Sequence, residues 1–119
     1  MKLWPIVAVA LGGALGTLGR IGADLAMMGL SGGHEWATLG VNLLGSLGLG
    51  LVMGHGLPGL SSALRDGLTV GVLGSYTTMS GVAVLAVALP ALGAAYVLAT
   101  VALGIAAAWM GYLVGRKLS

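Results

Sequence analysis

Residues 64–89 read LRDGLTVGVLGSYTTMSGVAVLAVAL, an apolar run whose middle, residues 74–81, is the cluster GSYTTMSG. A helix needs about 20 mostly apolar residues to cross a bilayer, so this run is long enough. Glycine, serine and threonine in its middle make a poor uninterrupted helix. A break at membrane depth is tolerated only where the freed backbone groups are buried or line a cavity. We therefore expect a membrane-spanning helix broken near Gly74–Thr78; the alternative is a continuous helix whose hydroxyls bond back to carbonyls one turn earlier.

Three further apolar stretches accompany this one. Hydrophobic residues make up 58% of the 119 residues, charged residues only 7%, and the mean hydropathy is +1.07. A soluble domain carries about 25% charged residues, so a soluble globular fold is excluded. Polar or proline-containing segments separate the stretches. We predict an all-α integral membrane protein, one domain over residues 1–119, with transmembrane helices at about 3–30, 36–54, 64–89 and 91–114.

The few charges suggest an orientation in the membrane. With four spans, one side of the bilayer holds both termini and the middle loop, and the other side holds at most Arg20 among the basic residues. The basic residues of the first side are Lys2, Arg65, Arg116 and Lys117. The positive-inside rule therefore places both termini in the cytoplasm, with the chain crossing the inner (cytoplasmic) membrane several times. The net charge of +2 rests on too few residues for a nucleic-acid surface.

The sequence offers no arrangement typical of catalysis. Cysteine is absent, and no Ser-His-Asp or paired-carboxylate constellation is apparent, so we do not expect an enzyme. His34 and His55 lie in separate loops, and we do not expect them to form a side-chain metal site. Any function is therefore expected to lie within the membrane.

Residues 36–54 carry a polar stripe. Thr38, Asn42 and Ser46 are spaced four apart, which places them on one face of a helix. The Asn42 amide must face protein or water, because an unsatisfied polar group is costly in hydrocarbon. One interpretation is a hydrogen bond that joins two helices. The other is a hydrogen-bond donor for a permeating anion.

Arg20 is the one charged residue that could lie within a span. An ion pair with Asp24, one turn later, would be a sufficient structural explanation. Arginine within a membrane otherwise suggests a functional role, here the attraction of anions into a vestibule. Glycines spaced four apart recur in every span and allow close helix packing. Four such thin helices leave little interior for a pathway, so we expect an oligomer, most simply a dimer.

Three motifs, in order, resemble those of the Fluc/CrcB family of small bacterial fluoride channels. Residues 12–20, GGALGTLGR, are similar to the family's GGxxGAxxR, and residues 40–46, GVNLLGS, contain its VNxxGS. Residues 74–80, GSYTTMS, are similar to its GGxTTFS. The size and the number of spans also agree over the whole chain.

The resemblance implies an antiparallel dimer with fluoride pores between its subunits. By this resemblance Asn42 lines a pore, Arg20 lies toward the vestibule, and Ser80 belongs to a track of hydroxyls. Backbone carbonyls of Gly74 and Thr77 would hold a structural sodium ion on the dimer axis. The fluoride pathway expected here comprises Arg20, Thr38, Asn42, Ser46, Met79, Ser80 and Val82.

The sequence departs from the family at the aromatic residues of the pore. The chain has no phenylalanine, and Met79 and Val82 stand where the family has two. Methionine fills similar space with a polarizable side chain, whereas valine is smaller. The excess of basic residues on one side also argues against insertion in both orientations.

These observations leave three functions to compare. The first is passive fluoride export by a homodimer. The second is a partner subunit with a degenerate pore in a heterodimeric fluoride channel. The third is a small four-helix multidrug transporter, which would need a carboxylate buried in the first span; Asp24, the only candidate, lies too near the helix end.

Overall fold

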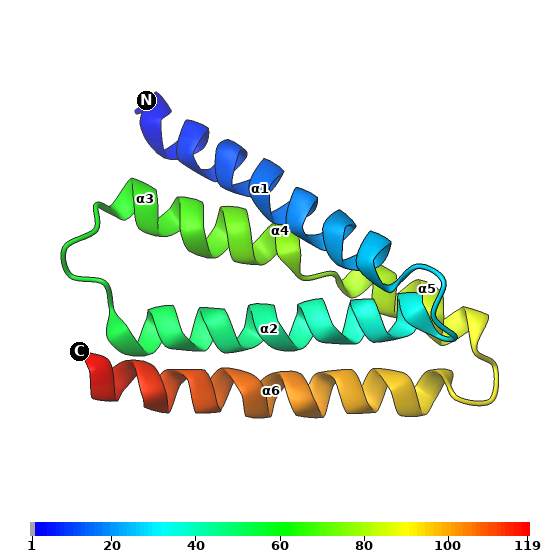
Figure 1. The fold of residues 1–119 in the computed structure, drawn as a ribbon. Coiled ribbons are helices and arrows are strands. Elements are labelled where there is room, and N and C mark those ends of the chain that lie inside the picture. Colours follow the sequence, from blue (N-terminus) through cyan, green and yellow to red (C-terminus); the bar gives the residue numbers. More distant parts are fainter. Residues whose placement is uncertain (1) are drawn as a thin grey trace.

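A computed structural model describes residues 2–119 of the chain, and every regular element in that range is helical. Four helical segments are long and apolar enough to cross a membrane. They are α1 (Leu3–Met27), α2 (Gly33–His55), the composite span Ser62–Ala88 and α6 (Gly93–Leu118). Both ends of the chain and the α2–α3 loop lie at one end of the bundle (Figure 1). The predicted all-helical fold with four spans is therefore confirmed.

The ends of the helices differ from the expected ones by a few residues. The first helix ends at Met27 rather than near residue 30, because the connection turns through Gly29 and Gly32 at φ +94° and +68°. These left-handed conformations suit glycine. The second helix consequently begins at Gly33 instead of Trp36. The last helix begins only at Gly93 and extends to Leu118, past the expected end at residue 114.

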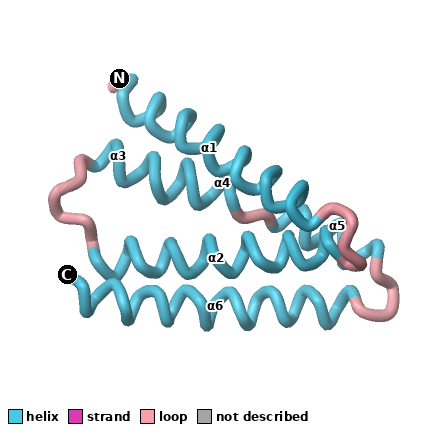
Figure 2. Tube along the Cα trace, viewed as in Figure 1, coloured by secondary structure: helices cyan, strands magenta, loops and turns pink. Residues whose placement is uncertain are grey.

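The third span consists of four consecutive elements. They are α3 (Ser62–Asp66), the π-helical segment η1 (Gly67–Leu73), α4 (Gly74–Tyr76) and α5 (Met79–Ala88). Between α4 and α5 the backbone of Thr77 (φ −77°, ψ 157°) and Thr78 (φ −145°, ψ 119°) is extended. Figure 2 shows this connection as a short loop between helices within the span.

Glycines set the packing of the helices within the chain. A Cβ atom at Gly50 would meet the carbonyl oxygen of Ala108, and one at Gly111 would meet that of Leu47. The helices α2 and α6 therefore lie side by side at backbone contact (Figure 1). In the same way Gly12, together with Gly16 and Gly71, brings α1 against the third span. These glycine pairs are used inside one chain, so they do not by themselves indicate a partner.

The side chains buried within the chain are mostly small. Val82 is 1% exposed, and Val41 is 2% exposed. Large apolar side chains cover the outside of the helices instead. This distribution is typical of helices that face lipid or other membrane helices, where apolar exposure carries no penalty.

Candidate ion pathway

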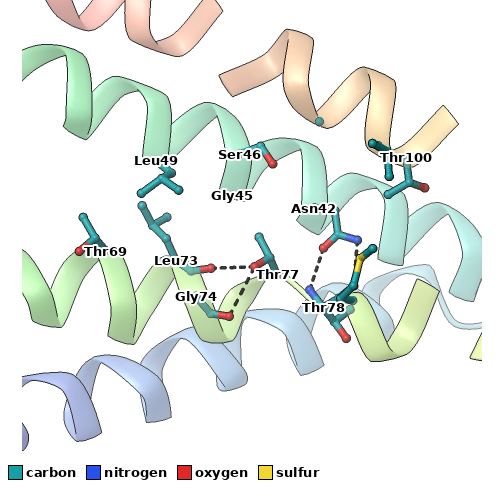
Figure 3. Close-up of a pocket in the computed structure, with 13 residues that line it drawn as sticks. Asn42, Gly45, Ser46, Leu49, Thr69, Leu73, Gly74, Thr77, Thr78 and Thr100 are labelled. Carbon is teal, nitrogen blue, oxygen red and sulfur yellow. Dashed lines mark hydrogen bonds between the residues drawn. The ribbon is translucent and has the colours of Figure 1, made fainter. Parts of the chain in front are cut away.

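The amide of Asn42 joins α2 to the extended segment of the third span. Its Nδ2 atom donates to the carbonyl oxygen of Thr78 at 3.0 Å, and the Thr78 backbone N–H donates to its Oδ1 at 2.7 Å (Figure 3). A Cβ atom at Gly45, on the same helix α2, would collide with the Thr77 side chain. Gly45 therefore allows the segment to approach α2. One N–H of the Asn42 amide remains for a further acceptor, because a primary amide carries two.

The threonines of the extended segment stabilise the helix ends on either side. The Thr78 hydroxyl accepts a hydrogen bond from the backbone N–H of Gly81 at 2.9 Å, so it caps α5. The Thr77 hydroxyl donates to the carbonyl oxygens of Leu73 at 3.2 Å and Gly74 at 3.4 Å. Hydrogen bonds from α2 and from the segment's own side chains thus hold it in its extended conformation.

Two backbone carbonyls remain weakly engaged at this segment. In a continuous helix the Thr78 N–H would donate to the Gly74 carbonyl, but here it donates to Asn42. The Gly74 oxygen keeps only the 3.4 Å contact with Thr77. The Thr77 carbonyl precedes the N-cap of α5 and so lies outside that helix's hydrogen-bond ladder. Carbonyls freed in this way are ligands that suit a sodium ion.

A pocket of about 300 Å³ lies between α2, the third span and α6. Asn42, the extended segment and the exposed side chain of Met79 line it, so the extended segment faces this pocket (Figure 3). Its remaining polar side chains are hydroxyls, contributed by Ser46, Thr69, Thr77, Thr78 and Thr100. The hydroxyls of Thr69, Thr77 and Thr100 donate to backbone carbonyls one turn earlier. The uncharged donors that the pocket leaves free therefore include the Ser46 hydroxyl and the second N–H of Asn42.

A second pocket of about 200 Å³ lies near the α1–α2 connection, and Thr78 borders both pockets. Its polar side chains are those of Arg20, Asp24, His34, Thr38, Thr78 and Ser80. The Ser80 hydroxyl lies 3.2 Å from that of Thr78. The polar stripe on α2 thus contributes to the lining of both pockets, with Ser46 in the first and Thr38 in the second.

The ion pair between Arg20 and Asp24, one of the two alternatives for Arg20, is not seen among the described residues. The Asp24 carboxylate instead lies 2.8 Å from Nδ1 of His34, within hydrogen-bond distance. The Arg20 Nε atom is buried and has no hydrogen-bond partner. That alternative considered neighbours on one helix, whereas the α1–α2 turn brings His34 to Asp24.

Val82 occupies a different environment from the other expected pathway residues. Its side chain is fully buried between helices and lines neither pocket, whereas Met79 is 67% exposed. The chain itself therefore fills the space around Val82. No cluster of three or more His, Cys, Asp or Glu side chains suited to a metal ion occurs among the described residues.

Residues 7–112 match the protein family described as CrcB-like protein, Camphor Resistance (CrcB). The chain belongs to this family. The CrcB-like chain is 42% identical over 117 residues to the fluoride-specific ion channel FluC of Thermus thermophilus, covering 92% of this chain and 94% of that one. It is 39% identical over 121 residues to FluC of Agrobacterium fabrum, covering 95% and 97% of the two chains. It is 36% identical over 121 residues to FluC of Geobacter sulfurreducens, covering 95% and 98%.

Membership of the CrcB-like family confirms the resemblance seen in the three sequence motifs. The four spans and these relatives identify the chain as a multi-pass membrane protein. The relatives are named as ion channels, which agrees with the prediction that the chain is not an enzyme.

Sequence reasoning missed the polar residues that the CrcB-like chain carries on α6. Thr100 is 6% exposed, lines the larger pocket and donates to the Tyr96 carbonyl oxygen at 2.8 Å. The Tyr96 hydroxyl donates to the carbonyl oxygen of Glu35 at 2.9 Å. A signal was present in the sequence, because Tyr96, Thr100 and Gly104 follow one helix face of an otherwise apolar span.

Proposed function

We propose that this chain forms a fluoride-selective channel that lets fluoride leave the cell passively across the cytoplasmic membrane. The observation that carries the proposal is the row of uncharged donors along the two pockets that share Thr78. The relatives named fluoride-specific ion channels support fluoride as the ion. Fluoride is strongly hydrated, so a selective path must replace its water with hydrogen-bond donors.

Asn42 and the hydroxyls replace water as hydrogen-bond donors to the ion along the path. The N–H of Asn42 that Thr78 leaves unused donates to the ion in the larger pocket. The Ser46 hydroxyl acts there, and those of Thr38 and Ser80 act in the smaller pocket. Arg20 raises the local anion concentration at the pocket nearer the α1–α2 turn. Met79 forms the apolar wall that excludes competing water.

The proposal places the conducting path where two chains meet. The larger pocket is open, and the exposed Met79 side chain and exposed Gly74 lie at its edge. A second copy would cover these groups and turn the open pocket into an enclosed path. Val82 is buried within the chain, so its proposed role is to pack the helices that carry the path.

Sodium fits the two carbonyls freed at the extended segment. Gly74 and Thr77 would hold it through their backbone oxygens, and a second copy would contribute the same pair. A bound sodium ion would neutralise these carbonyl dipoles and join the two broken spans. These oxygens suit a hard cation, because carbonyl oxygen is a ligand that hard cations prefer.

The charge distribution favours a second candidate, a heterodimer in which this chain is the partner with the weaker pore. Lys2, Arg65, Arg116 and Lys117 bias insertion toward one orientation, so an oppositely oriented partner would be a different chain. The absence of phenylalanine fits a subunit whose partner supplies the better pore. A small multidrug transporter has less support, because Asp24, its only candidate carboxylate, pairs with His34 at the helix end.

Growth in fluoride tests the proposed function. Bacteria that lack a fluoride exporter are made to express this chain alone and are grown over a range of fluoride concentrations. Growth at fluoride concentrations that stop vector-only cells supports a self-sufficient channel. Growth only when a related subunit is co-expressed supports the heterodimer, and no protection in either case contradicts fluoride export.

A further inference from the structure

The smaller pocket brings one carboxylate and two possible cationic partners together. Arg20 and Asp24 lie one turn apart on α1, the spacing at which opposite charges ordinarily pair. The Asp24 carboxylate is nevertheless bonded to His34, which enters from the first turn of α2, at 2.8 Å. All three side chains line the same pocket.

The conformation of the α1–α2 connection determines which partner Asp24 takes. Gly29 and Gly32 both have positive φ, and a Cβ at Gly33 would strike the carbonyl oxygen of Met27. The tight turn therefore starts α2 directly against the end of α1. His34, the second residue of α2, is placed within reach of Asp24 by this geometry.

Arg20 is left without the carboxylate that its own helix offers. Its side chain is half-buried, and the buried Nε atom has no hydrogen-bond partner. The neighbouring polar groups of the pocket are the hydroxyls of Thr38 and Ser80. A guanidinium with an unused N–H beside hydroxyls is an arrangement that attracts and holds a small anion.

We propose that His34 is a positioning residue of the anion vestibule, which holds the Asp24 carboxylate away from Arg20. This inference rests on the proposed function, since it names what keeps the entry of the pathway positive. Without His34, Asp24 would turn to Arg20, cancel its charge and occupy its N–H donors. Fluoride would then meet a neutral ion pair at the pocket instead of an available guanidinium.

A double-mutant cycle separates this role from a merely structural one. Initial fluoride efflux from liposomes is measured for wild type, His34→Ala, Asp24→Asn and the double variant. We expect His34→Ala to reduce efflux at low fluoride by roughly threefold to tenfold, because ion attraction by a charged cleft is lost. Asp24→Asn should conduct at least as fast as wild type, and the double variant should match Asp24→Asn. The inference is overturned if the double variant stays as slow as His34→Ala, which would mean that His34 only holds the turn.

His55→Ala provides a matched control at the opposite end of the bundle. His55 accepts a hydrogen bond from the Leu57 backbone N–H and lines neither of the two pockets. Its replacement should leave efflux within about twofold of wild type, since the vestibule charge is unchanged. An equal loss in His34→Ala and His55→Ala would indicate a general effect of histidine removal and would contradict the inference.

Nitrogen NMR of the arginine side chains provides a readout that does not need conduction. The chain contains Arg20, Arg65 and Arg116, so the Arg20 Nε–H signal can be assigned by its loss in Arg20→Lys. In detergent-solubilised His34→Ala without fluoride we expect this signal to move as Asp24 binds, and to return in the double variant. An unmoved signal would overturn the inference. If wild-type liposomes release no fluoride, the proposed function fails, while this comparison still tests whether His34 keeps Asp24 from Arg20.

Discussion

Asn42 on α2 and Thr78 in the extended segment of the third span, separated by 36 positions in the chain, exchange two hydrogen bonds. The side-chain amide of Asn42 mimics a peptide group, so it pairs with both the N–H and the carbonyl of Thr78. We therefore expect both interpretations of Asn42 from the sequence to apply to one side chain. The amide joins two helices, and it has an N–H left for an ion.

Asn42→Asp tests that double role. An ionised carboxylate still accepts from the Thr78 N–H but donates to neither the Thr78 carbonyl nor an anion. We expect fluoride efflux from liposomes to fall at least about tenfold, since a buried acceptor left unpaired costs about 1–3 kcal/mol and the carboxylate repels fluoride. Ser46→Ala, one turn along α2, is the milder comparison. Efflux of Asn42→Asp equal to that of Ser46→Ala would remove Asn42 from the pathway.

The Thr78 cap should contribute to stability. Thr78→Val removes the hydroxyl that accepts from the Gly81 N–H but keeps the shape of the side chain. We expect a loss of about 1 kcal/mol in the free energy of unfolding, the usual value of an N-cap. Thr78→Ser retains the cap and should stay close to wild type. Chemical unfolding in detergent micelles measures both, and equal stability of the two variants would contradict the assignment.

Backbone contact between α2 and α6 predicts a sharp difference between glycines. Gly111→Ala would place a methyl group against the Leu47 carbonyl oxygen, whereas nothing lies within 4 Å of a Cβ at Gly22. We expect Gly111→Ala to destabilise the fold by about 1–3 kcal/mol, as overpacking does. Gly22→Ala should be neutral or stabilising, because alanine favours a helix over glycine. Thermal unfolding of the two variants in micelles checks this, and equal melting temperatures would refute the packing.

Met79 and Val82 should respond differently to phenylalanine. The family has phenylalanine at both positions. At Val82 a ring has no space, since the side chain is only 1% exposed. Met79→Phe, at a position 67% exposed, should fold normally and conduct at least as well as wild type. Val82→Phe should lose about 1–3 kcal/mol of stability. Higher flux from a stable Val82→Phe variant would show that this position lines the path.

Removal of sodium tests the site proposed at Gly74 and Thr77. Replacing sodium with a large organic cation on both sides of the liposome membrane should slow fluoride efflux several-fold. The reason is that weakly paired carbonyls in the membrane lose a ligand that compensates them. The effect should reverse on adding sodium back. Efflux that does not depend on the cation would exclude a functional sodium ion.

The spans and the polar stripe could be predicted from the sequence, because hydropathy and helical periodicity are local properties. The cluster that contains Thr77 and Thr78 was also recognisable from its composition. The partner of Asn42 was not, since the pairing joins positions on different spans. The same holds for Asp24, whose nearest candidate along the helix is Arg20 and whose actual partner is His34 across a turn. Burial of Val82 likewise depends on how the helices pack, which no motif encodes.

Fluoride efflux from liposomes containing only this purified chain tests the central claim most directly. Fluoride efflux is followed with a fluoride electrode once the membrane potential is dissipated. Chloride efflux is measured from the same preparation. The account predicts rapid fluoride release, far above that of protein-free liposomes, with chloride retained. Fluoride release that does not exceed the protein-free rate, with or without a related subunit present, would contradict it, as would equal release of both ions.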